Sequence, residues 1–228
     1  MQGADPDVAL SRAVGGNFSA VGRLEHALLR SLGLADGQLV VDVGCGSGRL
    51  ASHLTTYPKL RYIGCDIEPR LVEHARHVSL RPDWLFLCTD GFDIPCADAR
   101  SDFVCFFSVF THLPHEHTYR YIGDAWRVLK PGGRLVFSFL EFRIGCHWSV
   151  FETGLGNGAR SNQPLNQFIS RDAIEAWATH AGFIIDHIFD GDRPHIPLDG
   201  EVVWDDGHRM RDLGNLGQSV AVLRKPIS

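Results

Sequence analysis

A glycine-rich turn is the first feature of this 228-residue chain whose residue types could hold a ligand. The residues from Val40 to Leu50 are Val-Val-Asp-Val-Gly-Cys-Gly-Ser-Gly-Arg-Leu, an apolar run followed by three glycines. Glycine adopts backbone angles that other residues avoid, and it lets a ligand approach where a Cβ atom would clash. The pattern predicts a strand, a tight turn and a helix that hold a ligand, although the same turn also occurs without one.

An acidic residue ends the next predicted strand. Asp66 closes the apolar stretch Tyr-Ile-Gly-Cys-Asp, 18 residues beyond Gly48. In doubly wound folds an acid at this place accepts hydrogen bonds from ribose hydroxyl groups. Alternatively, Asp66 is the N-cap of a helix that starts at Pro69. A nicotinamide dinucleotide fits poorly, because Arg49 stands where the Gly-x-Gly-x-x-Gly fingerprint requires its third glycine.

Four segments together make the pattern more specific, since their order and separations agree with one known family. They are Val41–Gly48, Gly64–Ile67, Thr89–Gly91 and Arg127–Leu135. In these segments the chain resembles the class I S-adenosylmethionine-dependent methyltransferases, over somewhat less than half of its length. The resemblance implies S-adenosylmethionine as cofactor and a Rossmann-like fold whose last strand, Ser219–Leu223, is antiparallel to the others.

The resemblance also implies which residues bind the cofactor. They lie at the carboxyl ends of the first four strands and in the loops that follow. The implied contacts are Asp42 and Gly44 at the methionine end, Gly46 and Gly48 in the turn, Asp66 at the ribose, Asp90 at the adenine amino group, Ile67 and Phe92 beside the ring, and Gly91 and Ser108.

The loop after the fourth strand supplies the candidate catalytic residue. Ser108–Pro114 lies at the carboxyl edge of the sheet, where open α/β folds bind ligands. Methyl transfer needs alignment of the reacting atoms, and it needs a base only if the acceptor carries a proton. His112 is the predicted base because histidine titrates near neutral pH; alternatively, its imidazole braces the loop. Weaker candidates lie on long connections, namely Glu141, His147 and His195.

Several acceptor classes lack their expected residues. Enzymes that methylate base amines resemble one another in an Asn/Asp-Pro-Pro-aromatic sequence where this chain has Ser108–Thr111. The Pro95–Cys96 pair precedes the fourth strand, so it is misplaced for attack on cytosine. The net charge of −5, without any run of basic residues, also disfavours nucleic acid. The sequence therefore favours a small-molecule acceptor, and a protein or nucleic acid substrate stays an alternative.

The residues also favour a metal-independent reaction. Ser108 and Glu141, after the fourth and fifth strands, offer too few oxygens for a hard divalent ion. Pro114 prevents His112, His115 and His117 from sharing one helix face, which disfavours a zinc site. We expect transfer to an oxygen or nitrogen of the acceptor. A non-catalytic protein that only binds S-adenosylmethionine remains a second function class, since a fold does not fix a function.

Apolar runs alternate with segments of helical period, which predicts a doubly wound α/β domain with seven strands. The predicted strands are 39–43, 61–65, 84–88, 103–107, 134–139, 183–189 and 219–223. The predicted helices are 20–32, 49–56, 69–78, 117–129 and 171–181. The turn at Lys130–Gly133 is expected to be architectural. Two long connections with aromatic residues, 141–170 and 190–218, are predicted lids over the acceptor.

The bulk composition sets the broad class. With 44% hydrophobic and 21% charged residues, one domain over residues 1–228 is expected. Residues 1–16 lack the pattern of a signal peptide, and no apolar run is long enough for a membrane helix, so a cytoplasmic protein is expected. The six cysteines are scattered and predicted to be small core residues, not a disulfide framework.

Overall fold

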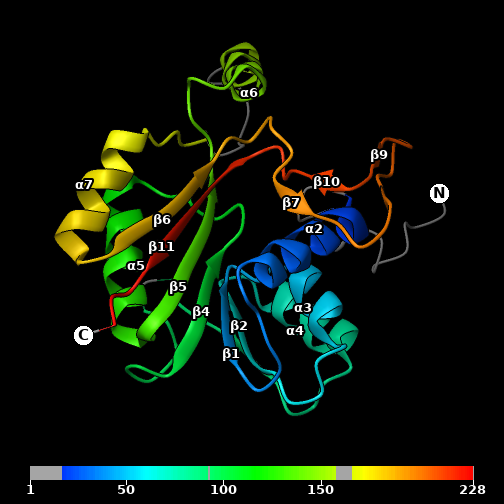
Figure 1. Ribbon diagram of the computed structural model, residues 1–228, viewed down its shortest axis with the longest axis vertical. Helices are drawn as coiled ribbons and strands as arrows, with labels where there is room; N and C mark the ends of the chain where they lie inside the picture. Colours follow the sequence, from blue (N-terminus) through cyan, green and yellow to red (C-terminus); the bar gives the residue numbers. More distant parts are fainter. Residues whose placement is uncertain (1–16, 92, 158–165, 228) are drawn as a thin grey trace. The chain divides into compact units, whose positions relative to one another are not determined.

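The computed structural model describes residues 17–91, 93–157 and 166–227. They group into two compact units, one with the described residues up to Gly91 and Pro194–Gly214, the other with the remainder. Seven strands form a sheet in the order β3-β2-β1-β4-β5-β11-β6 (Figure 1). Strands β1 to β3 belong to the first unit and the other four to the second. The predicted seven-stranded, mostly parallel α/β fold is confirmed, whereas the single domain stays a prediction.

Parallel strands with helical crossovers build the first unit. Strand β1 (Leu39–Val43) is buried along its whole length, as its unbroken apolar run predicts. It pairs in parallel with β2 (Arg61–Asp66), which pairs in parallel with β3 (Leu85–Cys88). The parallel pairing brings the carboxyl ends of the three strands, and the loops that follow them, to one edge.

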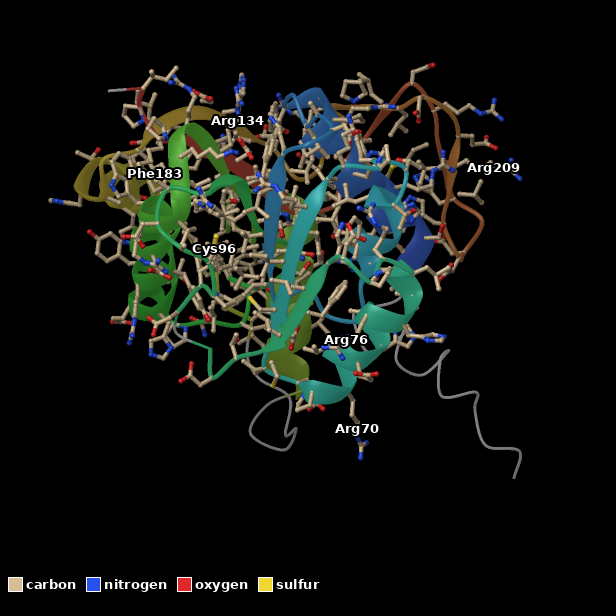
Figure 2. The ribbon with its side chains drawn as sticks, turned by 90° about the horizontal axis from the view of Figure 1, so that it is seen from below. Arg70, Arg76, Cys96, Arg134, Phe183 and Arg209 are labelled. Atoms are coloured by element: carbon tan, nitrogen blue, oxygen red, sulfur yellow. The ribbon has the colours of Figure 1, made fainter. Side chains whose placement is uncertain are left out.

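Three helices connect and cover these strands. They are α2 (Phe18–Ser31), α3 (Arg49–Leu54) and α4 (Pro69–Ser79). On α4, Arg76 Nη2 donates to the Phe86 carbonyl of β3 at 2.8 Å. Arg70, in the first turn of α4, instead projects away from the protein into solvent (Figure 2). The hydrogen bond from Arg76 therefore ties this helix to the edge strand β3.

The second unit contains the other four strands of the sheet. Strand β4 (Ser101–Phe106) pairs in parallel with β5 (Leu129–Phe139). Strand β11 (Ser219–Arg224) lies between β5 and β6 (Ile184–Phe189) and is antiparallel to both. This confirms the prediction that the last strand of the sheet is antiparallel to its neighbours.

Helices α5 (His115–Val128) and α7 (Arg171–Ala181) pack against each other beside these strands (Figure 1). Buried aromatic rings fill the space beneath them. The Phe106 ring stacks on Phe110 with centroids 4.5 Å apart, and Phe110 contacts Phe137 at 5.0 Å. Each such pair adds about 0.5–1.5 kcal/mol beyond the burial of its area. The core therefore fixes the end of β4 against β5.

Strand β5 is longer than predicted, because the Lys130–Gly133 segment is part of the strand and not a turn before it. Gly132 has a positive φ of 80°, a conformation that favours glycine. Its N–H donates to the Lys225 carbonyl at 2.9 Å, and the Lys225 N–H donates to Gly133 at 2.9 Å. The backbone of the Lys130–Gly133 segment is therefore hydrogen-bonded to Lys225, which supports its expected role as part of the architecture of the sheet.

Both long connections contain structure that the sequence did not predict. Residues 141–170 include helix α6 (Gly145–Asn157), which stands beyond the ends of β5, β6 and β11 (Figure 1). Residues 190–218 include four short strands: β7 (Ile196–Pro197), β8 (Val202–Val203), β9 (Arg209–Met210) and β10 (Leu213–Gly214). Of these, β7 and β8 pack against α2 of the same unit. The role of the two connections as lids stays a prediction.

Candidate active site

The glycine turn follows β1 in the first unit and has a conformation that requires its glycines. Gly44, Gly46 and Gly48 have φ values of 73°, 53° and 89°, in the left-handed region. A Cβ atom on Gly48, at the start of α3, would lie 2.8 Å from the Ala75 Cα atom of α4. A larger residue would therefore push α3 and α4 apart. The turn is therefore fixed both by backbone conformation and by packing.

The Asp66 carboxylate holds this turn in place. Its Oδ2 atom accepts a hydrogen bond from the Gly46 N–H at 2.9 Å, and Oδ1 accepts from the Glu68 N–H at 3.0 Å. The N-cap of α4 is Glu68, whose side chain accepts from the Arg70 N–H. The alternative in which Asp66 caps that helix is therefore wrong. Asp66 joins the ends of β1 and β2 at the edge where a ligand is expected.

Other predicted cofactor residues of the first unit lie at the same edge. Ile67 follows β2 and is 69% exposed, a large value for an apolar side chain. Asp90 and Gly91 follow β3, and the Asp90 side chain is exposed. The Ser47 hydroxyl in the glycine turn is buried and has no hydrogen-bond partner among the described residues. Because buried polar groups are normally paired, this hydroxyl points to a ligand that supplies the partner.

Asp42 lies beneath the turn in a buried polar cluster. The Tyr62 hydroxyl donates to its carboxylate at 2.6 Å, and burial raises the pKa of Asp42 to about 7. Nearby, Arg49 donates to Glu25 at 2.7 Å, and burial also raises the pKa of Glu25. The ion pair explains why arginine stands where a dinucleotide fingerprint has glycine.

In the second unit, Ser108 begins the loop after β4. It has a φ of 59°, which is strained for a residue with a side chain. Its N–H donates to the Ser138 hydroxyl at 2.7 Å, and its own hydroxyl accepts from Gln218 Nε2 at 3.2 Å. The Gln218 amide oxygen is buried without a partner in the described part of the chain. Phe92, another predicted cofactor residue, lies outside the described residues.

His112 lies four residues further along this loop and is exposed. The surrounding protein still displaces enough water to lower the pKa of His112 below its ordinary value. No described residue makes a hydrogen bond with its imidazole. His115 instead braces the loop, through a 3.0 Å hydrogen bond between Nε2 and the Phe168 carbonyl. The bracing alternative for His112 therefore has no hydrogen bond to support it.

The Glu141 carboxylate, which follows β5, is bound by side chains of other elements. Its carboxylate is buried and accepts two hydrogen bonds from Arg171, at 3.0 and 2.8 Å, and one from Ser219 at 2.5 Å. Arg171 also pairs with Asp190. This network ties together the end of β5, the start of α7, the end of β6 and the start of β11, so its role is structural.

The other two histidine candidates also have backbone partners. His147 is buried, and its Nδ1 accepts from the Glu141 N–H at 3.0 Å. Its Nε2 must then carry the proton that is donated to the Gly217 carbonyl at 3.1 Å. Both ring nitrogens are occupied, which leaves none for an acceptor. His195 lies before β7 in the first unit, where its main-chain N–H donates to the Gly214 carbonyl at 2.8 Å, and its imidazole Nε2 is buried.

Comparison with known proteins gives this geometry its context. The family described as "Methyltransferase domain" matches residues 41–137, a range that contains the glycine turn, Asp66, Ser108 and His112. This methyltransferase-domain match covers 97 of the 228 residues, somewhat less than half of the chain. It agrees with the resemblance to the class I S-adenosylmethionine-dependent methyltransferases seen in the sequence.

Relatives of the chain differ in their acceptors. Over 149 residues the chain is 30% identical to a malonyl-[acyl-carrier protein] O-methyltransferase from Hahella chejuensis, covering 64% of this chain and 50% of that one. Over 229 residues it is 28% identical to a sterol 24-C-methyltransferase from Eremothecium gossypii, covering 92% and 58%. The chain thus spans about half the length of these relatives.

Solved structures show the same fold. Magnesium protoporphyrin IX methyltransferase from Synechocystis PCC 6803, determined with bound SAH, is similar with a TM-score of 0.62 and 19% identity. The similarity covers 90% of this chain and 84% of that one. At this low identity the likeness establishes the fold and leaves the acceptor open.

The cysteines and the possible metal ligands of the described residues are spread over the chain. Within residues 17–91, 93–157 and 166–227, no group of three or more His, Cys, Asp or Glu side chains could hold a metal ion. Cys96 lies on the loop before β4 (Figure 2), and its carbonyl accepts from Arg127 at 2.9 Å. None of the six cysteines, all of which lie in the described residues, forms a disulfide bond. Three are buried, but Cys88 and Cys146 are exposed, so the core prediction is wrong for those two.

No helix in the described part of the chain is both long and apolar enough to cross a membrane.

The buried Asp42 makes the stability of the protein depend on pH. Its pKa rises from 3.8 to about 7 on folding, so between these values the folded state keeps a proton that the unfolded state loses. Stability contributed by Asp42 therefore falls as pH rises through this window and stays low above it. The neutral Asp42→Asn variant avoids this loss, and we expect it to be more stable than the parent at pH 8 by a few kcal/mol.

Thermal melts of parent and Asp42→Asn between pH 4.5 and 8.5 test this expectation. Glu25 titrates in both proteins, so the difference between their melting temperatures isolates Asp42. The difference should grow with pH and level off above about pH 7. A difference that is the same at every pH would assign the effect to packing and not to the charge.

Proposed function

We propose that this chain is a metal-independent enzyme that transfers the methyl group of S-adenosylmethionine to an oxygen or nitrogen atom of a small molecule. One observation carries the proposal: the Asp66 carboxylate bonds the Gly46 N–H of a turn whose three glycines all have positive φ. This arrangement presents a carboxylate and a backbone without Cβ atoms at the same sheet edge. A nucleoside with a free ribose diol needs both features.

The residues of the first unit fit the cofactor. The orphaned Ser47 hydroxyl lacks a partner that a bound ligand would supply, and exposed Ile67 offers an apolar surface for the adenine ring. We propose that Asp66 holds the ribose, Asp90 the adenine amino group and Asp42 the methionine end. The methionine end of the cofactor carries a positively charged α-ammonium group. A positive charge beside Asp42 would favour the ionised form of its carboxyl group.

When bound, S-adenosylmethionine supplies an electrophilic methyl group on a positively charged sulfur. The chain must then orient the acceptor and remove its proton, if it has one. We propose that His112 takes this proton. Partial burial lowers the pKa of His112, which keeps the imidazole neutral and its lone pair available at pH 7. The absence of a described hydrogen-bond partner leaves that lone pair free for the acceptor.

The small-molecule acceptor is supported by the acidic net charge of −5 and by the sterol in the name of one relative. The names of the two relatives include both an O-methyltransferase and a C-methyltransferase, so they do not decide the atom. The exposed imidazole of His112 favours an acceptor that must lose a proton. A carbon acceptor, a protein or nucleic acid acceptor, and a protein that binds the cofactor without turnover are the alternatives.

Formation of S-adenosylhomocysteine tests the proposal directly. The chain is incubated with S-adenosylmethionine and a panel of phenols, carboxylic acids and amines, with and without EDTA. We expect product only when an acceptor is present and an unchanged rate in EDTA. Loss of activity in EDTA that added metal restores would overturn the metal-independent mechanism. Cofactor binding without product, across the panel and across alkenes and macromolecules, would favour the non-catalytic alternative.

Asp66→Ala is expected to weaken S-adenosylmethionine binding about 10- to 100-fold, since hydrogen bonds to a charged group contribute about 1.5–3 kcal/mol each. Calorimetric titration of parent and variant measures the change. Glu73→Ala is the matched control, because it removes an exposed acid of the same unit that does not touch the turn. An affinity in Asp66→Ala equal to that of the parent would remove Asp66 from the cofactor site.

A further inference from the structure

Four aromatic rings of the second unit form a cluster next to the carboxyl end of β5. Phe142 stacks on Phe168 with ring centroids 4.4 Å apart and planes inclined by 11°. Phe151 contacts both rings edge-on, at 5.3 and 5.8 Å, and Trp148 packs on Phe151 at 5.1 Å. We call Phe142, Trp148, Phe151 and Phe168 the aromatic cluster. No step of the proposed reaction uses it.

The aromatic cluster is only partly covered by protein. Phe168 at its base is 9% exposed, whereas Phe142 is 52% and Trp148 44% exposed. Aromatic side chains are normally buried much more completely, because they carry large apolar areas. Phe142 and Trp148 therefore expose apolar surface to solvent beside a buried ring, and we call this exposed surface the platform.

Hydrogen bonds connect this platform to the candidate catalytic loop. The Gln167 N–H donates to the Thr111 carbonyl at 2.8 Å, next to His112, and His115 holds the Phe168 carbonyl at 3.0 Å. On the other side, the Ile169 N–H donates to the Leu140 carbonyl of the β5 end at 2.8 Å. The segment that carries Phe168 thus joins the ends of β4 and β5. The platform is continuous with the sheet edge where open α/β folds bind ligands.

The size of the platform argues against a second protein as its occupant. The exposed parts of Phe142 and Trp148 together offer on the order of 200 Å² of apolar surface. A stable protein interface needs about 800 Å² from each partner. A flat ring system of one or two fused rings matches the area much better. The planes of Phe142 and Trp148 are inclined by 62°, with centroids 6.3 Å apart, so such a ring system would stack on one of them and meet the other edge-on.

We propose that the aromatic cluster binds the methyl acceptor and that this acceptor contains a flat aromatic ring. The proposal rests on the proposed function and specifies its substrate class. Phe142 and Trp148 hold the ring, one by stacking and the other by an edge-on contact, and the ring carries the hydroxyl or amino group to be methylated. The buried Gln218 amide oxygen, in the same unit, lacks a described partner and is a polar group available for hydrogen bonding to such a ligand.

Equilibrium dialysis of the full chain, without cofactor, tests the proposal with 2-naphthol and with its saturated analogue decahydro-2-naphthol. Both carry one hydroxyl on two fused rings, but only the first is flat. We expect the parent to bind 2-naphthol at least about 5-fold more tightly, and Phe142→Ala and Trp148→Ala each to weaken it by a similar factor. Tyr119→Ala, which removes an exposed aromatic ring of α5, is the control with unchanged affinity.

Trp148→Leu guards against a folding defect, because it keeps apolar area at this position but removes the planar ring. We expect Trp148→Leu to bind 2-naphthol more weakly than the parent does, and to bind the saturated analogue as tightly as the parent does. Equal affinity of the parent for both compounds, or unchanged binding in all three variants, would overturn the proposal. So would sedimentation showing a parent dimer that Trp148→Ala converts to monomer. Titration of S-adenosylmethionine into the same proteins reports separately on the proposed function.

Discussion

Replacing His112 with alanine is expected to lower kcat about 10²- to 10⁴-fold, the range typical of losing a general base. Cofactor affinity should hardly change, because the imidazole acts on the acceptor. In the parent, kcat should fall as pH is lowered through the pKa of His112, since only the neutral imidazole accepts a proton. Burial places that pKa below the ordinary 6.5 of histidine. The variant should lose this dependence on pH.

Single-turnover rates across pH, at saturating cofactor, measure the effect for an oxygen or nitrogen acceptor. His112→Gln separates two roles, because glutamine can orient an acceptor by hydrogen bonding but cannot take its proton at neutral pH. His180→Ala is the control for removal of an exposed histidine of the same unit. If kcat of His112→Ala stays within a few-fold of the parent and keeps its pH profile, alignment alone accounts for the rate and His112 is not the base.

Replacing Arg171 with methionine is expected to destabilise the chain by about 3–5 kcal/mol, because it leaves the buried Glu141 carboxylate without its cationic partner. Glu141 would keep the Ser219 hydroxyl, but a hydroxyl does not balance a buried charge. For a chain of this size the melting temperature should fall by roughly 6–20 °C. Thermal melts and urea unfolding give the two independent measures.

A double variant separates the ion pair from local packing. Arg171→Met combined with Glu141→Leu removes both charges, and apolar replacements of a buried pair are often nearly neutral, so much of the lost stability should return. Arg143→Met is the control, since Arg143 lies 3.9 Å from Glu141 and is 59% exposed; it should change stability by less than about 0.5 kcal/mol. A double variant as unstable as the sum of its parts would show that the two charges are not coupled.

The positions of the main strands along the chain and the glycine turn could be predicted from the sequence, because both depend on local pattern. Continuous apolar runs mark buried parallel strands, and the β1 run from Leu39 to Val43 is buried throughout, as that pattern requires. The spacing of Gly44, Gly46 and Gly48 likewise marks a turn that needs positive φ, and all three have it. These features are encoded within a few residues, which is why the sequence alone indicates them.

Features that depend on distant residues could not be predicted in this way. Helix α6 contains Gly145, Gly154 and Gly156 in a sequence of poor helix propensity, and its Phe151 ring packs on Phe168, beyond the end of the helix in the chain. The role of Glu141 depends on Arg171, 30 residues away. Asp66 was correctly placed at the sheet edge, but its hydrogen bond to Gly46 joins two strands and became visible only in the structure.

The most direct test of the central claim is calorimetric titration of the full chain with S-adenosylmethionine and, in parallel, with NAD⁺. The glycine turn held by Asp66, with Arg49 in place of a third fingerprint glycine, predicts one site for S-adenosylmethionine and no binding of NAD⁺. At a concentration 100 times its Kd the bound cofactor should also stabilise the chain by about 2.7 kcal/mol. Binding of NAD⁺ with no binding of S-adenosylmethionine would contradict the account.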